Sequence, residues 1–293
     1  MKPSAPVYIV TKGRWKSRRT SRSLELIGVP YLIVVEDQEL SEYASVIDKK
    51  KILVLDRQYQ RDYETCDDLG DTKSLGPGPA RNFVWDHSSA NGHGWHWVMD
   101  DNIGTECPTG GFYRFNKNLK VQVSDGTIFK CMEDFVSRYS NVAMAGPNYF
   151  MFASRKSKVP PFILNTRIYS CNLIKNSVPF RWRGRYNEDT DLSLRILKAG
   201  LCTVLFNAFL QDKETTQLMR GGNTSEFYSK EGTLPKSSML VRLHPDVAKL
   251  SWNWGRPHHY VDYSRFKKNG LIRRPGLQIQ SETDNYGMQL VTV

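Results

Sequence analysis

The sequence predicts a single-domain α/β fold in which a mostly parallel sheet is flanked by helices. Residues 7–10, 31–35 and 51–55 are short runs rich in β-branched and aromatic residues. The segments between these runs are long enough for crossover helices, which gives a βαβαβ order. Within each run the apolar residues are consecutive and do not alternate with polar ones. This is typical of parallel strands that are covered on both faces.

The later elements follow from the same patterns. Residues 57–79 are polar and contain glycine and proline, so we expect a mobile loop. A helix begins at Pro79 and ends before Asn91, because proline favours the first turn of a helix. The remaining expectations are a strand at 95–99, irregular chain at 110–120, a helix at 128–139, a buried strand at 142–145, one or two strands at 162–174, a helix at 188–199 capped by Asn187, and a strand at 202–209.

Composition and charge limit the class of protein. The chain has 293 residues, of which 40% are hydrophobic and 12% aromatic, and this excludes a disordered or collagen-like polymer. Its formal net charge of +11 is compatible with a polyanionic partner such as nucleic acid. The longest apolar runs fall far short of the ~20 residues that cross a bilayer, so we expect no membrane partner. Five scattered cysteines without a C-x-x-C pair, and no secretion signal, predict a cytoplasmic protein.

A first acidic cluster follows the predicted strand at 95–99. It consists of Asp100, Asp101 and Asn102. In open α/β sheets, ligands bind at the carboxyl ends of the strands, which is where this cluster stands. Its oxygens are hard ligands for Mg²⁺ or Mn²⁺, and such an ion neutralises a diphosphate leaving group. The alternative is a solvated turn, since these residue types favour turns.

A second acidic cluster stands at the start of the helix predicted for 188–199. Glu188, Asp189 and Asp191 fall within four residues of each other. Acidic side chains in a first helical turn are stabilised by the helix dipole and need no other function. A carboxylate next to a reacting hydroxyl group removes its proton during attack, so a general base is the functional interpretation.

Basic and histidine-rich segments provide further candidates. Glycine allows the backbone to approach a ligand closely, and arginine binds phosphate. A diphosphate would therefore fit the loop of Thr11, Lys12, Gly13 and Arg14, or the loop that contains Arg220. Neither loop is a Walker A motif, and no G-x-G-x-x-G fingerprint is present. Three arginines alternate with aromatic residues and are candidates for binding nucleic acid: Arg181, Arg183 and Arg185. Two adjacent histidines near the C-terminal end are candidate metal ligands: His258 and His259.

The order of these motifs along the chain resembles that in the GT-A (Rossmann-like) glycosyltransferases, which use nucleotide sugars. More narrowly, the sequence resembles the TET/JBP-associated glycosyltransferases, which are found largely in phages. The segments that carry this resemblance are residues 8–14, 78–82, 97–102, 145–148 and 187–191, and the similarity runs from about residue 5 to 268. It implies one GT-A-like domain at 1–270, with a nucleotide-binding half at about 5–103 and an acceptor half at about 104–270. Residues 271–293 would form a polar, loosely attached tail.

The resemblance also implies roles for individual residues. Thr11, Lys12, Gly13 and Arg14 would lie beside the nucleotide, with Arg81 close to it, and Asp100 would contact the donor. Asn102 stands where the superfamily has a metal-binding acid, so Asp101 and His259 would complete the site for Mn²⁺ or Mg²⁺. Glu188 and Asp189 match the acidic pair of inverting relatives, and the base would be Asp189. An enzyme that retains the anomeric configuration needs no such base.

The implied function is transfer of a sugar, glucose or a pentose such as arabinose, from a UDP-sugar to the hydroxymethyl group of 5-hydroxymethylcytosine in duplex DNA. The enzyme would be a phage protein acting in the bacterial cytoplasm. A first alternative is a GT-A enzyme with a glycan, lipid or protein acceptor. A second alternative is a DNA-binding protein without catalysis.

Overall fold

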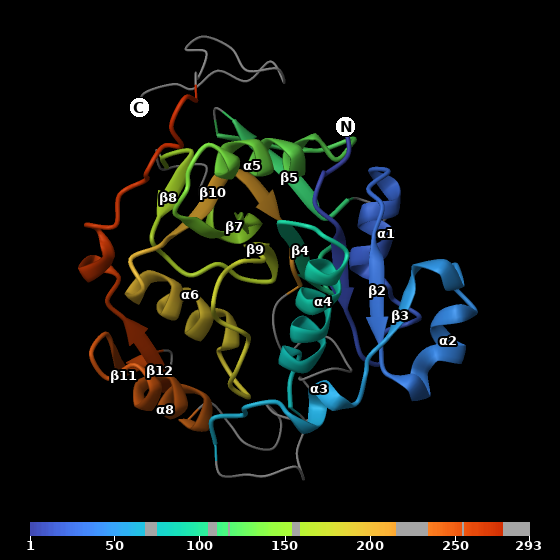
Figure 1. Cartoon of the computed structure of the whole chain (residues 1–293), viewed down its shortest axis with the longest axis horizontal. Coiled ribbons are helices and arrows are strands. Elements are labelled where there is room, and N and C mark those ends of the chain that lie inside the picture. The colour runs from blue at the N-terminus through green and yellow to red at the C-terminus, as the bar shows by residue number, and fades with distance from the viewer. Residues whose placement is uncertain are drawn as a thin grey trace.

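The computed structural model describes residues 1–67, 75–104, 110–116, 118–153, 159–214, 234–253 and 255–277. A ten-stranded mixed sheet forms its centre, in the order β3-β2-β1-β4-β9-β7-β10-β5-β6, with β8 paired to β10 (Figure 1). Its strands are β1 (Val7–Val10), β2 (Leu32–Val35), β3 (Ile52–Val54), β4 (Trp95–Asp100), β5 (Phe112–Asn116), β6 (Leu119–Gln122), β7 (Val142–Tyr149), β8 (Phe162–Leu164), β9 (Cys171–Lys175) and β10 (Cys202–Gln211).

Helices cover both faces of this sheet. The helices of the structure are α1 (Arg19–Leu26), α2 (Leu40–Ala44), α3 (Gln58–Arg61), α4 (Gly78–Ala90), α5 (Thr127–Ser137), α6 (Glu188–Lys198) and α8 (Leu234–Leu243). Alternate residues of the central strands enter two separate cores. One core contains side chains of α1 and α5, and the other contains side chains of α4 and α6. This arrangement confirms the predicted α/β class with strands covered on both faces, and Figure 1 shows α4 and α6 in front of the sheet.

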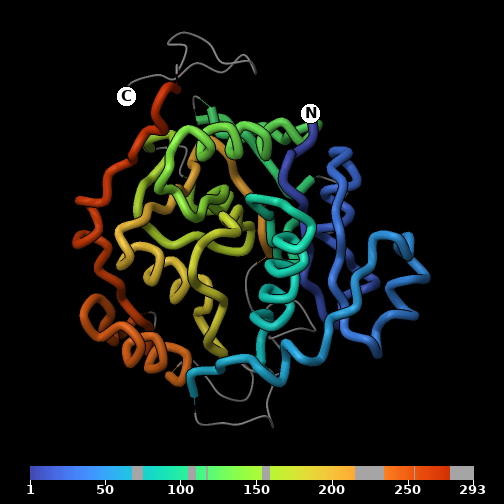
Figure 2. The backbone as a smooth tube through the Cα atoms, in the orientation of Figure 1, coloured from blue at the N-terminus to red at the C-terminus, as the bar shows by residue number. Residues whose placement is uncertain are grey.

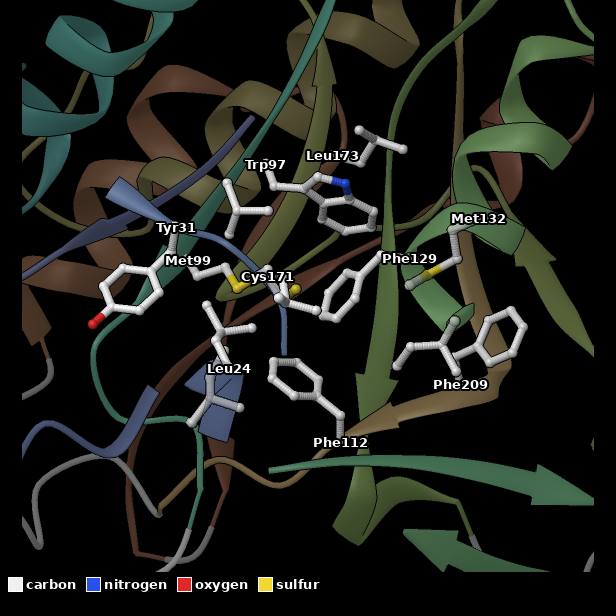
Figure 3. Close-up of a cluster of buried hydrophobic side chains, with 14 of the residues drawn as sticks. Leu24, Tyr31, Trp97, Met99, Phe112, Phe129, Met132, Cys171, Leu173 and Phe209 are labelled. Atoms are coloured by element: carbon white, nitrogen blue, oxygen red, sulfur yellow. The ribbon is translucent and has the colours of Figure 1, made fainter. Parts of the chain in front are cut away.

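Aromatic packing is concentrated beneath α5. The Trp97 ring meets Phe129 edge-on with ring centroids 5.1 Å apart, and Phe112 meets Phe129 at the same distance. All three side chains are fully buried. Figure 3 shows these rings between the sheet and α5. Because Trp97 belongs to β4, this packing fixes the strand whose end carries Asp100.

The chain at residues 110–120 corrects our expectation of irregular structure. It forms the antiparallel strands β5 and β6, joined at Asn118, whose φ is +64°. Of the five residues of β5, only Phe112 is fully buried. An edge hairpin that buries so little lacks the continuous apolar run that marks the central strands. The loop expected at 57–79 is also interrupted, by the short helix α3, and α4 begins at Gly78.

The C-terminal part of the described chain returns to the sheet. The helix α8 and the hairpin of β11 (Ala248–Asn253) and β12 (Arg256–Val261) pack beside α6, through a small core that includes Leu194, Leu197 and Leu240. The chain then runs back towards α5 (Figure 2). There the backbone nitrogen of Arg274 donates to Arg138, and Ile272 accepts from Ser140. The first tail residues are therefore attached to the domain, whereas residues 278–293 lie outside the described chain.

Candidate active site

The strand directions bring the predicted site segments to one edge of the sheet. Strands β1, β4, β7 and β10 share one direction, because β1 is parallel to β4, β7 is parallel to β10, and β9 is antiparallel to both β4 and β7. Their carboxyl ends therefore meet, and the beginning of the antiparallel β9 lies at the same edge. The residues at this edge are Thr11, Asp100, Tyr149, Ser170 and Lys213.

Arg81 joins the two acidic clusters. It comes from the first turn of α4, and its side chain is 2% exposed. One guanidinium nitrogen, Nη2, donates to Asp100 at 2.7 Å. The other, Nη1, donates to Asp189 at 2.7 Å and to Glu188 at 3.2 Å. Clusters that are almost ninety residues apart in sequence thus share one buried cation.

A second cation of this network, Lys213, was not singled out from the sequence, and its side chain is 13% exposed. Its Nζ donates to Asp100 Oδ2 at 2.7 Å and to Ser170 Oγ at 2.6 Å. Ser170 has a φ of +63°, in the left-handed region that side-chain-bearing residues rarely adopt. Lys213 stands two residues after the end of β10, at the edge of the sheet where the carboxyl-end rule places ligands, but a single lysine there has no distinctive sequence pattern.

The two aspartates of this network differ in their protonation. Burial raises the pKa of Asp189 to about 7, and the charges of Glu188 and Asp100 add to this effect against the opposing influence of Arg81. Burial acts in the same direction on Asp100, but Lys213 and Arg81 outweigh it and hold the pKa of Asp100 below its ordinary value. Asp100 therefore stays ionised at neutral pH, while Asp189 is poised to gain or lose a proton. An acid–base catalyst works best with a pKa near the operating pH.

The loop after β1 lies against Asp101. Thr11 Oγ1 donates to Asp101 Oδ2 at 2.7 Å, and Arg14 Nη1 forms an ion pair with Asp101 Oδ1. The Gly13 nitrogen donates to Glu39 at 2.6 Å, and Lys12 Nζ lies 3.4 Å from Glu36. The structure therefore brings the predicted nucleotide loop and the predicted metal ligand together.

The donor atoms for a divalent metal are only partly those expected. Asn102 Oδ1 is buried and has no hydrogen-bond partner among the described residues, so this oxygen fits a metal ligand, with Asp101 beside it in the chain. His259 lies on β12 opposite Leu250, and burial together with the cations Lys236 and Arg167 lowers its pKa to about 4. Within the described chain, no three His, Cys, Asp or Glu side chains form a metal-binding group. The geometry thus does not support His259 as the third ligand.

The three arginines proposed as a nucleic-acid surface have different environments. Arg181 is 43% exposed and pairs with Asp86, and Arg183 is 26% exposed and pairs with Asp191 and Glu64. Arg185 is fully buried and its Nε pairs with Asp67. Burial corrects the assignment of Arg185, because a buried guanidinium does not reach a DNA phosphate. Arg220 lies outside the described residues.

The beginning of α6 is held by contacts other than the expected cap. Asn187 has a φ of +52°, and its side chain donates to the Lys236 carbonyl at 2.7 Å instead of capping the helix. Asp191 is fully buried, and accepts hydrogen bonds from Arg183 and Arg195, with His244 Nε2 at 2.9 Å. These contacts anchor the turn that presents Asp189 to Arg81.

Comparison with known proteins places the chain in a family. The profile of the family described as TET-Associated Glycosyltransferase matches residues 5–222. No curated protein gives a match. A solved structure of glucosyl-3-phosphoglycerate synthase from Mycobacterium tuberculosis, in complex with Mg²⁺ and uridine diphosphate, aligns with a TM-score of 0.45 at 8% identity, over 89% of this chain and 88% of that one.

The family match includes Arg81 and both acidic clusters that Arg81 joins. It spans well over half of the sequence and begins just before β1. The chain is therefore a glycosyltransferase and belongs to the TET-associated glycosyltransferase family.

Proposed function

We propose that this enzyme transfers a sugar from a UDP-sugar to the hydroxymethyl group of 5-hydroxymethylcytosine in duplex DNA. The donor sugar is glucose or a pentose such as arabinose. The reaction takes place in the cytoplasm, where the cysteines remain reduced. No helix in the described part of the chain has the length and apolar character needed to span a membrane.

The observation that carries the proposal is the bridge formed by Arg81. It links Asp100, at the end of β4, to Asp189, at the start of α6, through two hydrogen bonds of 2.7 Å. The loop of residues 11–14 lies on the β1 and β4 side of this bridge, and Lys213 lies on the β10 side. A donor diphosphate beside residues 11–14 and an acceptor beside Asp189 would therefore meet at the bridge.

Asp189 acts as the general base in this scheme. Its carboxylate takes the proton of the hydroxymethyl group while the oxygen attacks the anomeric carbon of the sugar. A new carbon–oxygen bond forms, the bond from the anomeric carbon to the diphosphate oxygen breaks, and UDP leaves with the electron pair. Arg81 holds Asp189 in place. A fixed cation preserves this geometry during the reaction without reorganisation.

Asp101 and Asn102 are the residues that would hold Mn²⁺ or Mg²⁺. The ion would neutralise charge on the departing diphosphate. Arg14, which already pairs with Asp101, places a second cation near the same position. Chelation with EDTA is expected to stop transfer, and added Mn²⁺ to restore it.

The decisive experiment is mass spectrometry of nucleosides. DNA containing 5-hydroxymethylcytosine is incubated with the protein, Mn²⁺ and a panel of UDP-sugars, with unmodified DNA as the control. A mass gain on the modified nucleoside alone supports the proposal, and its size separates a hexose from a pentose. Hydrolysis of a UDP-sugar without any gain would point to a glycan, lipid or protein acceptor instead.

A further inference from the structure

A row of aromatic rings leads from the protein surface to the active site. Phe152, in the 3-10 turn η4 (Phe150–Phe152), is 56% exposed. Its ring centroid lies 5.5 Å from that of Tyr149, at the end of β7. The Tyr149 ring in turn lies 6.0 Å from that of Tyr169, and the two planes are inclined by only 15°. We call Phe152, Tyr149 and Tyr169 the aromatic row.

The inner end of the aromatic row touches the catalytic network. The hydroxyl of Tyr169 lies 3.2 Å from Thr190 Oγ1, and Thr190 directly follows Asp189. The hydroxyl of Tyr149 lies 2.8 Å from Ser170 Oγ, which also accepts a hydrogen bond from Lys213. Both tyrosines are only half-buried. Their rings therefore lie beside the position where the acceptor must present its hydroxyl group.

Cations accompany the aromatic row. The Arg167 guanidinium lies 5.1 Å from the centre of the Tyr169 ring, and Lys213 Nζ lies 6.0 Å from that of Tyr149. Lys120 Nζ lies 4.0 Å from the centre of the Phe150 ring, and Phe150 shares the turn η4 with Phe152. Rings that stack on bases, with cations for the phosphates, are the combination by which proteins hold unpaired nucleotides.

Burial of Asp189 favours an acceptor that enters the protein. The Asp189 side chain is only 12% exposed. The 5-substituent of a stacked, paired cytosine projects into the major groove. A nucleotide that leaves the helix can carry this substituent to a recessed carboxylate more closely than a nucleotide that stays stacked.

We propose that the enzyme flips the target base out of the duplex, that Phe152 enters the stack in its place, and that Tyr149 and Tyr169 guide the flipped pyrimidine to Asp189. This inference rests on the proposed function. Apolar side chains that enter between base steps are a known means of unstacking DNA, and enzymes that act on bases commonly extrude them.

Base flipping is measured with a duplex that carries 2-aminopurine next to 5-hydroxymethylcytosine. Loss of the stacking neighbour makes 2-aminopurine fluorescent, so binding of the wild-type enzyme should raise the emission. The Phe152→Ala variant should bind without this rise. Trp252→Ala is the matched control, because Trp252 is an aromatic side chain, 71% exposed, that lies on strand β11 and does not belong to the aromatic row. It should give the wild-type signal.

Transfer rates test the role of Phe152 separately. A single-stranded oligonucleotide needs no unpairing, so Phe152→Ala should lower the ratio of kcat/KM on duplex to kcat/KM on single strand by roughly tenfold or more. An unchanged ratio together with unchanged fluorescence would overturn the inference while leaving the proposed function intact. Equal losses on both substrates would also overturn it. Absence of transfer by the wild-type enzyme to either substrate would refute the proposed function and this inference with it.

Tyr169 distinguishes stacking from hydrogen bonding. Tyr169→Phe keeps the ring and removes the contact with Thr190, whereas Tyr169→Ala removes both. If the ring holds the base, KM for single-stranded acceptor should rise roughly tenfold more in Tyr169→Ala than in Tyr169→Phe. Equal KM values for the two variants would show that the ring does not contact the acceptor.

Discussion

Two aspartates in the first turn of α6 show how position determines the chemistry of a carboxyl group. Asp189 shares Arg81 with two other acids, so burial prevails and raises its pKa to about 7. Burial affects Asp191 as well, but His244, Arg183 and Arg195 outweigh it and lower the pKa of Asp191. The first group is therefore suited to proton transfer, and the second is a structural anion at neutral pH.

The pH dependence of transfer follows from Asp189. Only the carboxylate form accepts a proton, so kcat/KM should rise as pH increases through about 7 and then level off. Replacing Glu188 by Gln removes a nearby negative charge that raises the pKa of Asp189, so the midpoint should move to lower pH. Initial rates measured from pH 5 to 9 would check both expectations. A flat profile over this range in the wild-type enzyme would contradict the assignment of Asp189.

Isosteric amides separate the roles of the two aspartates. Asp189→Asn should reduce transfer by about a hundredfold or more, because the general base is lost. Its folding should be nearly unaffected, since Arg81 keeps Asp100 and Glu188 as partners. Circular dichroism and nucleoside mass spectrometry would show the contrast. Transfer at the wild-type rate by Asp189→Asn would exclude Asp189 as the base and favour a retaining mechanism.

Asp191→Asn should have the opposite effect. Breaking a buried ion pair costs about 3–5 kcal/mol, so urea unfolding should occur at clearly lower concentration. Because the pKa of Asp191 is lower in the folded state, its contribution is present above the ordinary carboxyl pKa and is lost as pH falls. The stability difference between the two proteins should therefore shrink in acid. A difference that stays constant down to low pH would contradict this role.

At the level of elements, the close approach of β7 to the start of β9 positions the active-site edge. A Cβ atom at Gly146, in β7, would lie 2.2 Å from the Cys171 carbonyl oxygen and 2.6 Å from Ile168 Cγ2. Backbone atoms cannot move aside without shifting the strand. Since Ser170 precedes Cys171 and contacts both Lys213 and Tyr149, a displacement here would move the active site.

Gly146→Ala is therefore expected to reduce both stability and activity. Forcing an extra methyl group into a packed interior costs about 1–3 kcal/mol. Gly94→Ala is the matched control, because a Cβ atom there meets no other atom within 4 Å. Thermal unfolding of the two variants provides the comparison, and equal melting temperatures would show that β9 accommodates the methyl group.

At the level of the whole molecule, net charge distinguishes the possible acceptors. A protein with a formal charge of +11 that contacts phosphates releases counterions from DNA, so the logarithm of its affinity should fall linearly with the logarithm of salt concentration. Fluorescence anisotropy with labelled duplexes at several salt concentrations measures the slope. A glycan acceptor without charge would give almost no slope, so salt-independent binding of the true acceptor would exclude DNA.

Local sequence was sufficient for much of the active-site edge. Consecutive apolar residues predicted β1, β2 and β3, a further strand was expected at 95–99, and the rule that ligands gather at the carboxyl ends of strands pointed to Asp100. The same reasoning missed Lys213, because a single lysine after a strand has no distinctive local pattern. Asn187 was expected to cap α6 because of its residue type. Its backbone is left-handed, and its side chain donates a hydrogen bond to the Lys236 carbonyl and does not cap the helix.

By itself, the sequence determined the α/β class, the excess positive charge and the residue types of the two acidic clusters, because these depend on composition and short-range periodicity. Only the tertiary structure decided which side chains meet. It placed Arg81 between Asp100 and Asp189, buried Arg185 against Asp67, and kept His259 among cations on β12. Contacts between residues far apart in the chain depend on strand order and direction, which no local pattern records.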